Sequence, residues 1–266
     1  MMAAARAGGR DIRVVQRRAM WALASREMRR VLSLWTQTLL PAVLTGVIFL
    51  AVFGAALGNQ LRTVAGVDYM RFILPGLLVM TVIGQAFANN STSLFQAKNE
   101  GYIEDVLTSP LRPWQLLVGY MSGGLLRGWL ATLLLWLAAW PFTGGVEDPV
   151  LFALALAMTG VIFSVLGVIT GMWADTFDQH AFVTSVLITP LALVAGVFYS
   201  TQQLAQPWQT LTHLDPIYYL VDATRHGYAG VHETPTWTAL TVAAVLAAAV
   251  FVVAAVLLDR GWRLKA

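Results

Sequence analysis

The chain has 266 residues, of which 58% are hydrophobic and only 12% are charged, and its formal net charge is +3. Soluble domains carry roughly 25% charged residues. Half that density cannot cover a water-facing globule, so the composition excludes a soluble enzyme. It predicts an all-α membrane protein with about six transmembrane helices. A β-barrel is excluded because its strands are segments of about 10 residues with alternating polarity, whereas the apolar runs here are longer and do not alternate.

Several kinds of site are excluded by residues that the sequence lacks. There is no cysteine, so neither a disulfide framework nor a thiolate metal site is expected. There is no G-x-x-x-x-G-K-[ST] motif, so the chain itself cannot hold nucleotide phosphates in the P-loop manner. The histidines show no ligand spacing, and no metal site is expected. The positive charge collects at membrane-flanking ends and forms no stripe with aromatic side chains, so no nucleic-acid partner is expected.

The N-terminal region is predicted to form a tail and a basic helix. Residues 1–11 are expected to be a disordered tail, and residues 12–32 an amphipathic helix. Apolar side chains lie on one face and arginines on the other, namely Trp21, Ala24, Met28 and Val31 against Arg18, Arg26, Arg29 and Arg30. This pattern is typical of a helix in the membrane interface, with its arginines at anionic headgroups. The alternative is a basic anchor that only orients the first span.

Six apolar stretches reach the roughly 20 residues that a helix needs to cross the bilayer. They make up a predicted transmembrane domain over 33–258, which a basic tail at 259–266 follows. Pro41 lies in the first stretch, where a kink is expected. The expected spans are 33–57, 71–95, 114–140, 149–173, 181–200 and 236–258.

The placement of Lys and Arg predicts that both ends of the chain are cytoplasmic. Eight arginines precede the first span, two basic residues lie in 96–113 and three in the tail, whereas the opposite side holds only Arg62, Arg71 and Arg225. Connection 96–113 is then cytoplasmic, and the long segment 201–235 faces outward.

The second predicted span carries a polar stripe. Gln85, Asn89 and Thr92 follow one another at helical steps, and Asn90 widens the stripe. Lipid does not tolerate such a stripe, so it must face protein or water. It either forms hydrogen bonds between helices or lines a translocation path. Arg127 is the one charge well inside a predicted span, and it either snorkels to the headgroups, faces the same path or pairs with a cytoplasmic acid.

The cytoplasmic connection 96–113 contains a short predicted helix that Pro110 ends. Apolar side chains share one of its faces and acids point elsewhere, namely Ile103, Val106 and Leu107 against Glu104 and Asp105. Such a helix suits docking into a groove of another protein. The alternative is an ordinary loop helix that lies on the bilayer.

The outward segment 201–235 is too apolar for a plain loop and too short for two full spans. Two short helices that dip into the outer leaflet fit this composition. Within the segment, Asp222 and Arg225 have the i, i+3 spacing of a helical ion pair.

Three motifs give the chain a resemblance to a known family. They are E-G-Y-I-E-D-V-L-T-S-P-L at Glu100 to Leu111, G-V-F-Y-S at Gly196 to Ser200, and L-D-P-I-Y-Y-L-V-D-A-T-R at Leu214 to Arg225. With them, over nearly its whole length, the sequence resembles the permease subunits of bacterial type-two ABC exporters, especially the YadH-like group. It departs from them at Asp215, where relatives commonly have Asn, although a carboxylate caps a helix as well.

The resemblance implies a homodimeric permease in the bacterial inner membrane, in contact with lipid and with two separate ABC ATPase subunits. ATP and Mg would bind to the ATPase, and no cofactor to this chain. The implied coupling helix with its flanks comprises Glu100, Gly101, Tyr102, Ile103, Glu104, Asp105, Leu107, Ser109 and Pro110. The implied re-entrant pair at the outer mouth includes Phe198, Tyr199, Asp215, Pro216, Tyr219, Asp222 and Arg225.

The resemblance thus implies a non-enzymatic permease that exports an amphiphile such as a lipid, a lipid-linked glycan or a hydrophobic drug. Its acids lie almost entirely in predicted loops, which argues against ion-coupled transport. An ATP-independent channel or facilitator is the alternative. An intramembrane enzyme is not expected, because the spans offer only amides and Arg127 for catalysis.

Overall fold

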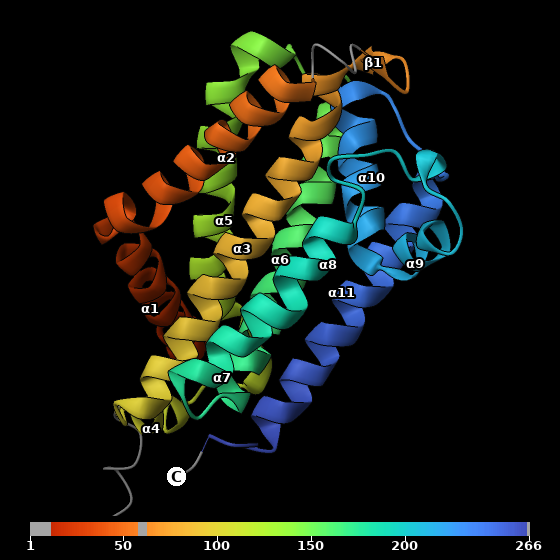
Figure 1. The fold of residues 1–266 in the computed structure, drawn as a ribbon. Helices are drawn as coiled ribbons and strands as arrows, with labels where there is room; N and C mark the ends of the chain where they lie inside the picture. Colours follow the sequence, from red (N-terminus) through yellow and green to blue (C-terminus); the bar gives the residue numbers. More distant parts are fainter. Residues whose placement is uncertain (1–11, 58–62, 265–266) are drawn as a thin grey trace, which may run out of the picture.

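The computed structural model describes residues 12–57 and 63–264, and almost all of them are helical (Figure 1). Within these described ranges, six helical segments are long and apolar enough to cross a membrane. This confirms the predicted all-α membrane fold. Five of these segments are continuous helices, namely α2 (Trp35–Leu57), α3 (Tyr69–Asn99), α5 (Pro113–Thr143), α6 (Pro149–Trp173) and α11 (Thr236–Asp259).

Helix α3 is the centre of the bundle and packs most extensively against α5 and α6 (Figure 1). Glycines permit these close approaches. A Cβ atom on Gly167 of α6 would lie 2.6 Å from the carbonyl oxygen of Phe87, and one on Gly171 would lie 2.8 Å from that of Ser91. Gly124 of α5 faces Asn90 in the same way. These three glycines therefore serve helix packing within the chain.

Helix α1 (Ile12–Ser33) lies along α5 and confirms the predicted helix at 12–32. The predicted apolar face of this helix is only in part the face that is buried. Trp21 is 67% exposed, whereas Leu23 and Glu27 are buried together with Ala24 and Val31. The reason is that α1 packs onto the glycine face of α5, where Leu23 and Glu27 fit over Gly119 and Gly123. The location of α1 in the membrane interface stays a prediction.

The fifth span is broken and differs from the continuous helix expected at 181–200. It consists of α7 (Phe177–Phe182), a π-helical stretch (Val183–Ile188) and α8 (Thr189–Val194). Pro190 has no N–H to donate to the preceding turn, and the backbone relaxes to the wider π spacing. Beyond Val194 the chain turns at Gly196, whose φ of +73° favours glycine.

The segment expected to hold two short helices contains α9 (Trp208–Leu214) and α10 (Pro216–Ala229), after a 3₁₀ turn at Thr201–Gln203. Helix α10 is largely buried against α3, α6 and α11. A small hairpin of β1 (Thr63–Val64) and β2 (Val67–Asp68) precedes α3. Whether α9 and α10 dip into the outer leaflet stays a prediction.

The predicted cytoplasmic helix is present as α4 (Ile103–Leu107). Gly101, with φ of +80°, makes the turn that leads from α3 into it. Figure 1 places α4, α7 and the C-terminus at the same end of the bundle. The predicted disordered tail at 1–11 and the last two residues lie outside the described part of the chain.

Candidate functional site

The stripe of α3 that its neighbours leave uncovered is polar. Between Met80 and Gln96, the half-exposed residues of α3 are Met80, Thr81, Gly84, Gln85, Ala88, Thr92 and Gln96. They recur at helical spacing and form one face, while most other side chains of α3 are buried. In a membrane-spanning helix this face cannot point into lipid without cost.

A cavity of about 170 Å³ lies against this stripe, and we call it the arginine cavity. It is lined by Arg30, Val31, Leu34, Thr38, Asn89, Thr92, Gln96 and Arg127. Its walls come from four helices, α1, α2, α3 and α5. The structure therefore brings Asn89, Thr92 and Arg127 of the predicted path together around one space, and it adds Arg30 from α1.

Both arginines of the cavity are held by α3. The Nε atom of Arg127 donates to Oε1 of Gln85 at 2.8 Å. Arg30 donates to the backbone oxygen of Asn89 at 3.1 Å and to its Oδ1 atom at 3.2 Å. An arginine at the centre of a span costs roughly 2.5–3.5 kcal/mol on insertion scales. The amides of α3 offset part of that cost and fix where the two positive charges point.

Asn90 does not line the cavity, contrary to its predicted place in the path. It is fully buried, and its Nδ2 atom donates to the backbone oxygen of Ser164 on α6 at 3.0 Å. One residue along a helix turns the side chain by about 100°, which takes Asn90 off the cavity face and into the α3–α6 contact. Its role is helix–helix packing.

Glu27 is a buried acid beside the cavity that the sequence analysis did not single out. Its side chain is 2% exposed. It accepts hydrogen bonds from Arg26 at 2.9 Å and from Ser93 at 2.7 Å, and it pairs with Arg30 at 3.1 Å. The only signal in the sequence was an acid among the arginines of a basic helix, and its burial depends on α3 and α5.

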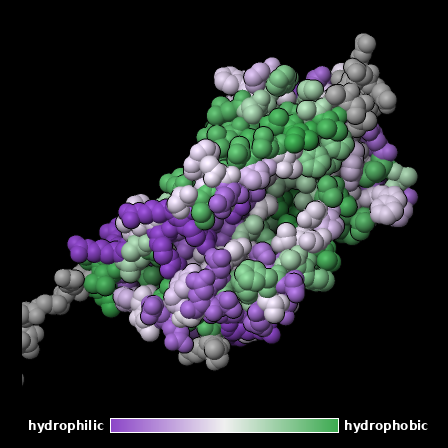
Figure 2. Space-filling model, turned by 60° about the vertical axis from the view of Figure 1, so that its left-hand side comes forward, coloured by the Kyte–Doolittle hydropathy of each residue, from purple (hydrophilic) through white to green (hydrophobic). Residues whose placement is uncertain are grey.

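A second hollow of about 330 Å³ lies between α2 and α3 along the same stripe of α3, and we call it the apolar hollow. Gln85 lines it and also bonds Arg127, which lines the arginine cavity. Its other lining residues are Pro41, Ala42, Thr45, Gly46, Phe49, Leu77, Met80 and Thr81. Figure 2 shows hydrophilic side chains gathered toward one end of this face and a furrow that runs from them into the hydrophobic half.

Aromatic side chains stack beside the apolar hollow. The Phe198 ring lies 4.6 Å from that of Phe53 and 6.1 Å from that of Phe49, between centroids. The backbone oxygen of Phe198 accepts a hydrogen bond from the Tyr69 hydroxyl. Phe198, predicted at the outer gate, thus lies against α2 and α3 next to the candidate path.

The predicted ion pair between Asp222 and Arg225 does not form. Asp222 instead accepts hydrogen bonds from the backbone N–H groups of Glu233 and Thr234, both at 2.9 Å. Arg225 is 1% exposed and donates to the backbone oxygen of Gly196 at 2.6 Å. Both side chains bond the backbone of neighbouring turns, at Gly196 and at Glu233 and Thr234. They do so because α10 is buried on the sides from which they project.

The other predicted gate residues anchor the same region. Asp215 caps α10 through a hydrogen bond from the Ile217 N–H at 2.9 Å, as expected for a carboxylate in this position. Burial raises the pKa of Asp215 to about 6. Pro216 is the first residue of α10. The hydroxyls of Tyr199 and Tyr219 donate to backbone oxygens of Val194 and His213.

The α4 region forms a separate candidate surface. Ile103 is buried, Val106 and Leu107 are half-buried, and the two acids of the helix are exposed, as the sequence pattern predicted. Glu100 and Pro110 on its flanks are exposed, and the Ser109 hydroxyl donates to the backbone oxygen of Val106. The Arg26 guanidinium of α1 lies 5.4 Å from the centroid of the Tyr102 ring. The acids are thus left free to contact another molecule.

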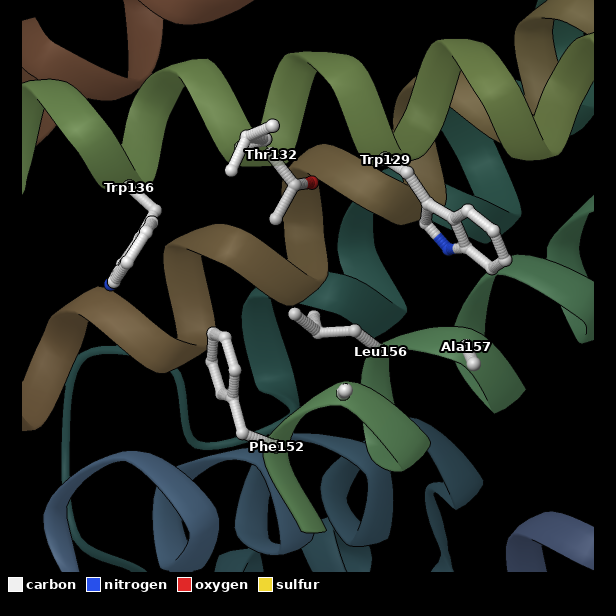
Figure 3. A pocket seen from close by; sticks show the side chains of 8 residues that line it. Trp129, Thr132, Trp136, Phe152, Leu156 and Ala157 are labelled. Carbon is white, nitrogen blue, oxygen red and sulfur yellow. The ribbon is translucent and has the colours of Figure 1, made fainter. Parts of the chain in front are cut away.

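A further hollow lies between α5 and α6, on a different side of α5 from the arginine cavity. It measures about 360 Å³ and has no charged lining residue (Figure 3). Trp129 and Trp136 of α5 and Phe152 of α6 surround it (Figure 3). Its apolar walls belong to α5 and α6, which are both long and apolar enough to cross a membrane.

The comparison with known proteins shows to which family the chain belongs. The model of the ABC-2 type transporter family matches residues 18–228. The chain belongs to the ABC-2 type transporter family. The match includes α3, α4, α5 and the predicted gate residues from Phe198 to Arg225.

Curated relatives of this ABC-2 chain are transport permeases and a nodulation protein. It is 36% identical over 249 residues to the inner membrane transport permease YadH of Escherichia coli, covering 93% of this chain and 96% of that protein. It is 25% identical over 205 residues to nodulation protein J of Neorhizobium galegae, covering 74% and 78%. It is 27% identical over 167 residues to the probable multidrug ABC transporter permease YbhR of Escherichia coli, covering 60% and 44%. The chain is therefore a multi-pass ABC transporter permease.

Proposed function

We propose that this permease exports an amphiphile across the bacterial inner membrane, powered by ATP hydrolysis on a separate chain. The observation that carries the proposal is the polar stripe of α3 with the arginine cavity and the apolar hollow against it. A polar site and an apolar one on the same face of α3 suit a molecule that has both parts. Lipids, lipid-linked glycans and hydrophobic drugs are the substrate classes that fit.

A second copy of the chain covers the stripe in the working permease. Thr81, Gln85, Thr92 and Gln96 are half-exposed in the single chain, and exposed polar groups are costly in hydrocarbon. The fifth span beside them is weakly held, since Val186 and Leu187 are about half exposed. Two copies that face each other across α2, α3 and this span would enclose a path between them.

The α4 helix contacts the ATPase and transmits its conformational change to the spans. Its exposed acids, Glu104 and Asp105, are free for a basic partner surface, while Ile103 anchors the helix in a buried cluster with residues of α3, α5, α6 and α11. A push on α4 is thereby passed to four helices. The contact between Arg26 and Tyr102 carries the same movement into α1.

Both ends of the chain lie in the cytoplasm in this proposal. Basic residues of α1, of the α4 region and of the C-terminal segment gather near one end of the bundle, which fits the positive-inside rule. ATP and Mg bind to the ATPase subunits at that end. The hairpin of β1 and β2 lies at the opposite end, together with the aromatic stack of Phe198 as part of the outer gate.

Purification of the tagged chain from mild detergent, followed by mass spectrometry, tests the proposal. We expect a P-loop ATPase in a one-to-one ratio with the permease and a permease dimer after crosslinking. An oligomer without any ATPase, found again after crosslinking in native membranes, would favour an ATP-independent channel instead.

A further inference from the structure

Arg127 is a cation of a membrane span that has no acid beside it. Its Nε atom donates to Gln85, and among residues 12–57 and 63–264 no carboxylate lies within 4.0 Å of its guanidinium. Charges inside the membrane normally pair with an opposite charge. The structure therefore leaves a place for an anion next to Arg127.

A second cation strengthens the positive character of this place. Arg30 lines the same cavity, and it shares the single carboxylate of Glu27 with Arg26. The three guanidinium groups of Arg26, Arg30 and Arg127 thus have the one carboxylate of Glu27 among them. No acidic side chain is among the described residues that line the cavity. Guanidinium groups are the preferred partners of phosphate and carboxylate oxygens, which they bind through paired hydrogen bonds. Thr92 and Gln96 add neutral donors on the α3 wall.

The apolar hollow offers a place for the hydrocarbon part of a ligand. It lies along the same stripe of α3 as the arginine cavity, and its lining is mostly apolar. Its lining residue Gln85 accepts the hydrogen bond from Arg127 of the arginine cavity. A hydrocarbon chain that enters this hollow leaves its headgroup beside Arg30 and Arg127. A free anion would leave the hollow empty, and an uncharged amphiphile would leave Arg127 unpaired.

We propose that the arginine cavity binds the anionic headgroup of an amphiphile, a phosphate or a carboxylate, while the apolar hollow takes its hydrocarbon chain. This inference rests on the proposed function and names its substrate class. A zwitterionic headgroup fits less well, because the cavity has no acid to meet a choline or ethanolamine cation.

Binding to the purified permease in neutral detergent tests the inference without ATPase or transport. The probe is dioctanoyl phosphatidic acid, compared with dioctanoyl phosphatidylcholine and with inorganic phosphate by isothermal titration. Phosphatidic acid is expected to bind more tightly than either. Arg127→Gln should weaken its binding by roughly tenfold or more, as expected for the loss of a charged hydrogen-bonding partner. Arg29→Gln is the matched control, since Arg29 is exposed on α1 outside the cavity.

A second variant separates an amphiphile from a free anion. Ala42 lines the apolar hollow and is half-buried, so Ala42→Trp should fill the hollow and weaken binding of phosphatidic acid alone. Equal binding of the two lipids, equal loss in R127Q and R29Q, or phosphate binding as tight as that of phosphatidic acid would overturn the inference. Co-purification of an ATPase without lipid binding would reject the headgroup site and leave the proposed function standing.

Discussion

The Nζ atom of Lys98 lies 2.8 Å from Oδ1 of Asp175, which joins the end of α3 to the loop between α6 and α7. The same ammonium donates to the backbone oxygen of Met172 at 2.9 Å. Arg263 of the C-terminal segment reaches the second oxygen of Asp175 at 3.4 Å and donates to the backbone oxygen of Trp173 at 2.7 Å. These contacts bind the chain's C-terminal segment to the bundle near α4.

The first prediction concerns Asp175 and pH. The hydrogen bond from Lys98 holds the pKa of Asp175 below its ordinary value, with a further contribution from Arg263. A lowered folded-state pKa means that the stabilising contribution is present above the unfolded pKa of about 3.9 and is lost as the pH falls through the lower, folded value. The C-terminal segment should therefore stay docked at neutral pH and loosen only in strong acid.

A nitroxide on an introduced Arg260→Cys reports this docking by electron paramagnetic resonance, since the chain has no native cysteine. Asp175→Asn should make the label mobile at neutral pH. Asp178→Asn in the first turn of α7 is the control, because Asp178 is exposed and belongs to none of the ion pairs of the described residues. Equal mobility in both variants would contradict the prediction.

The second prediction concerns the buried acid of α1. Glu27→Gln removes the charge that Arg26 and Arg30 share and weakens the bond from Ser93. We expect a loss of about 1–3 kcal/mol in stability, the usual cost of a buried polar group that loses its partner. Thermal unfolding in detergent measures it as a lower Tm. Glu104→Gln on exposed α4 should leave the Tm unchanged, and the same Tm for both variants would show that Glu27 is not a structural anchor.

The third prediction concerns Arg225 in the gate segment. Arg225→Met removes the donor to Gly196 and the cation that lies 3.9 Å from the centroid of the Phe72 ring. The expected loss is about 1.5–3 kcal/mol, as for hydrogen bonds that involve a charged group. Proteolysis should then cut more readily between α8 and α10. Arg71→Met, which breaks a more exposed ion pair with Glu147, should have little effect, and equal cleavage in both variants would argue against a special role of Arg225.

The sequence was sufficient for the spans and for α4, because length, apolar content and a stopping proline determine them locally. It was not sufficient for Asn89 and Asn90. In the sequence, both amides belong to one polar stripe. Only the positions of α1 and α6 determine that Asn89 lines the cavity while Asn90 packs inward.

The same limit explains the other differences. Glu27 becomes a buried anchor only because α1 packs onto glycines of α5. Asp222 and Arg225 have the spacing of an ion pair, yet each finds backbone partners from segments distant in sequence. The apolar sequence of the fifth span did not indicate the π-helical stretch before Pro190. Hydropathy carries no information about the spacing of backbone hydrogen bonds.

The fourth prediction concerns coupling through α4. Glu104→Lys reverses an exposed charge on the proposed contact with the ATPase and leaves the buried Ile103 anchor intact. In proteoliposomes that contain the permease and its ATPase, ATP hydrolysis should continue while transport of a fluorescent phosphatidic acid falls. Glu147→Lys at the opposite end is the control and should keep both activities. Normal transport per ATP in E104K would contradict the assignment of α4.

Photo-crosslinking in native membranes tests whether α4 contacts a separate ATPase. A benzophenone maleimide on Glu104→Cys places a reactive group on α4, and the same label on Glu147→Cys places it at the other end of the bundle. The chain has no cysteine of its own, so each label marks one position. We expect the label at 104 to form an adduct with a P-loop ATPase and the label at 147 to form none. An ATPase adduct from 147, or none from 104, would contradict this contact.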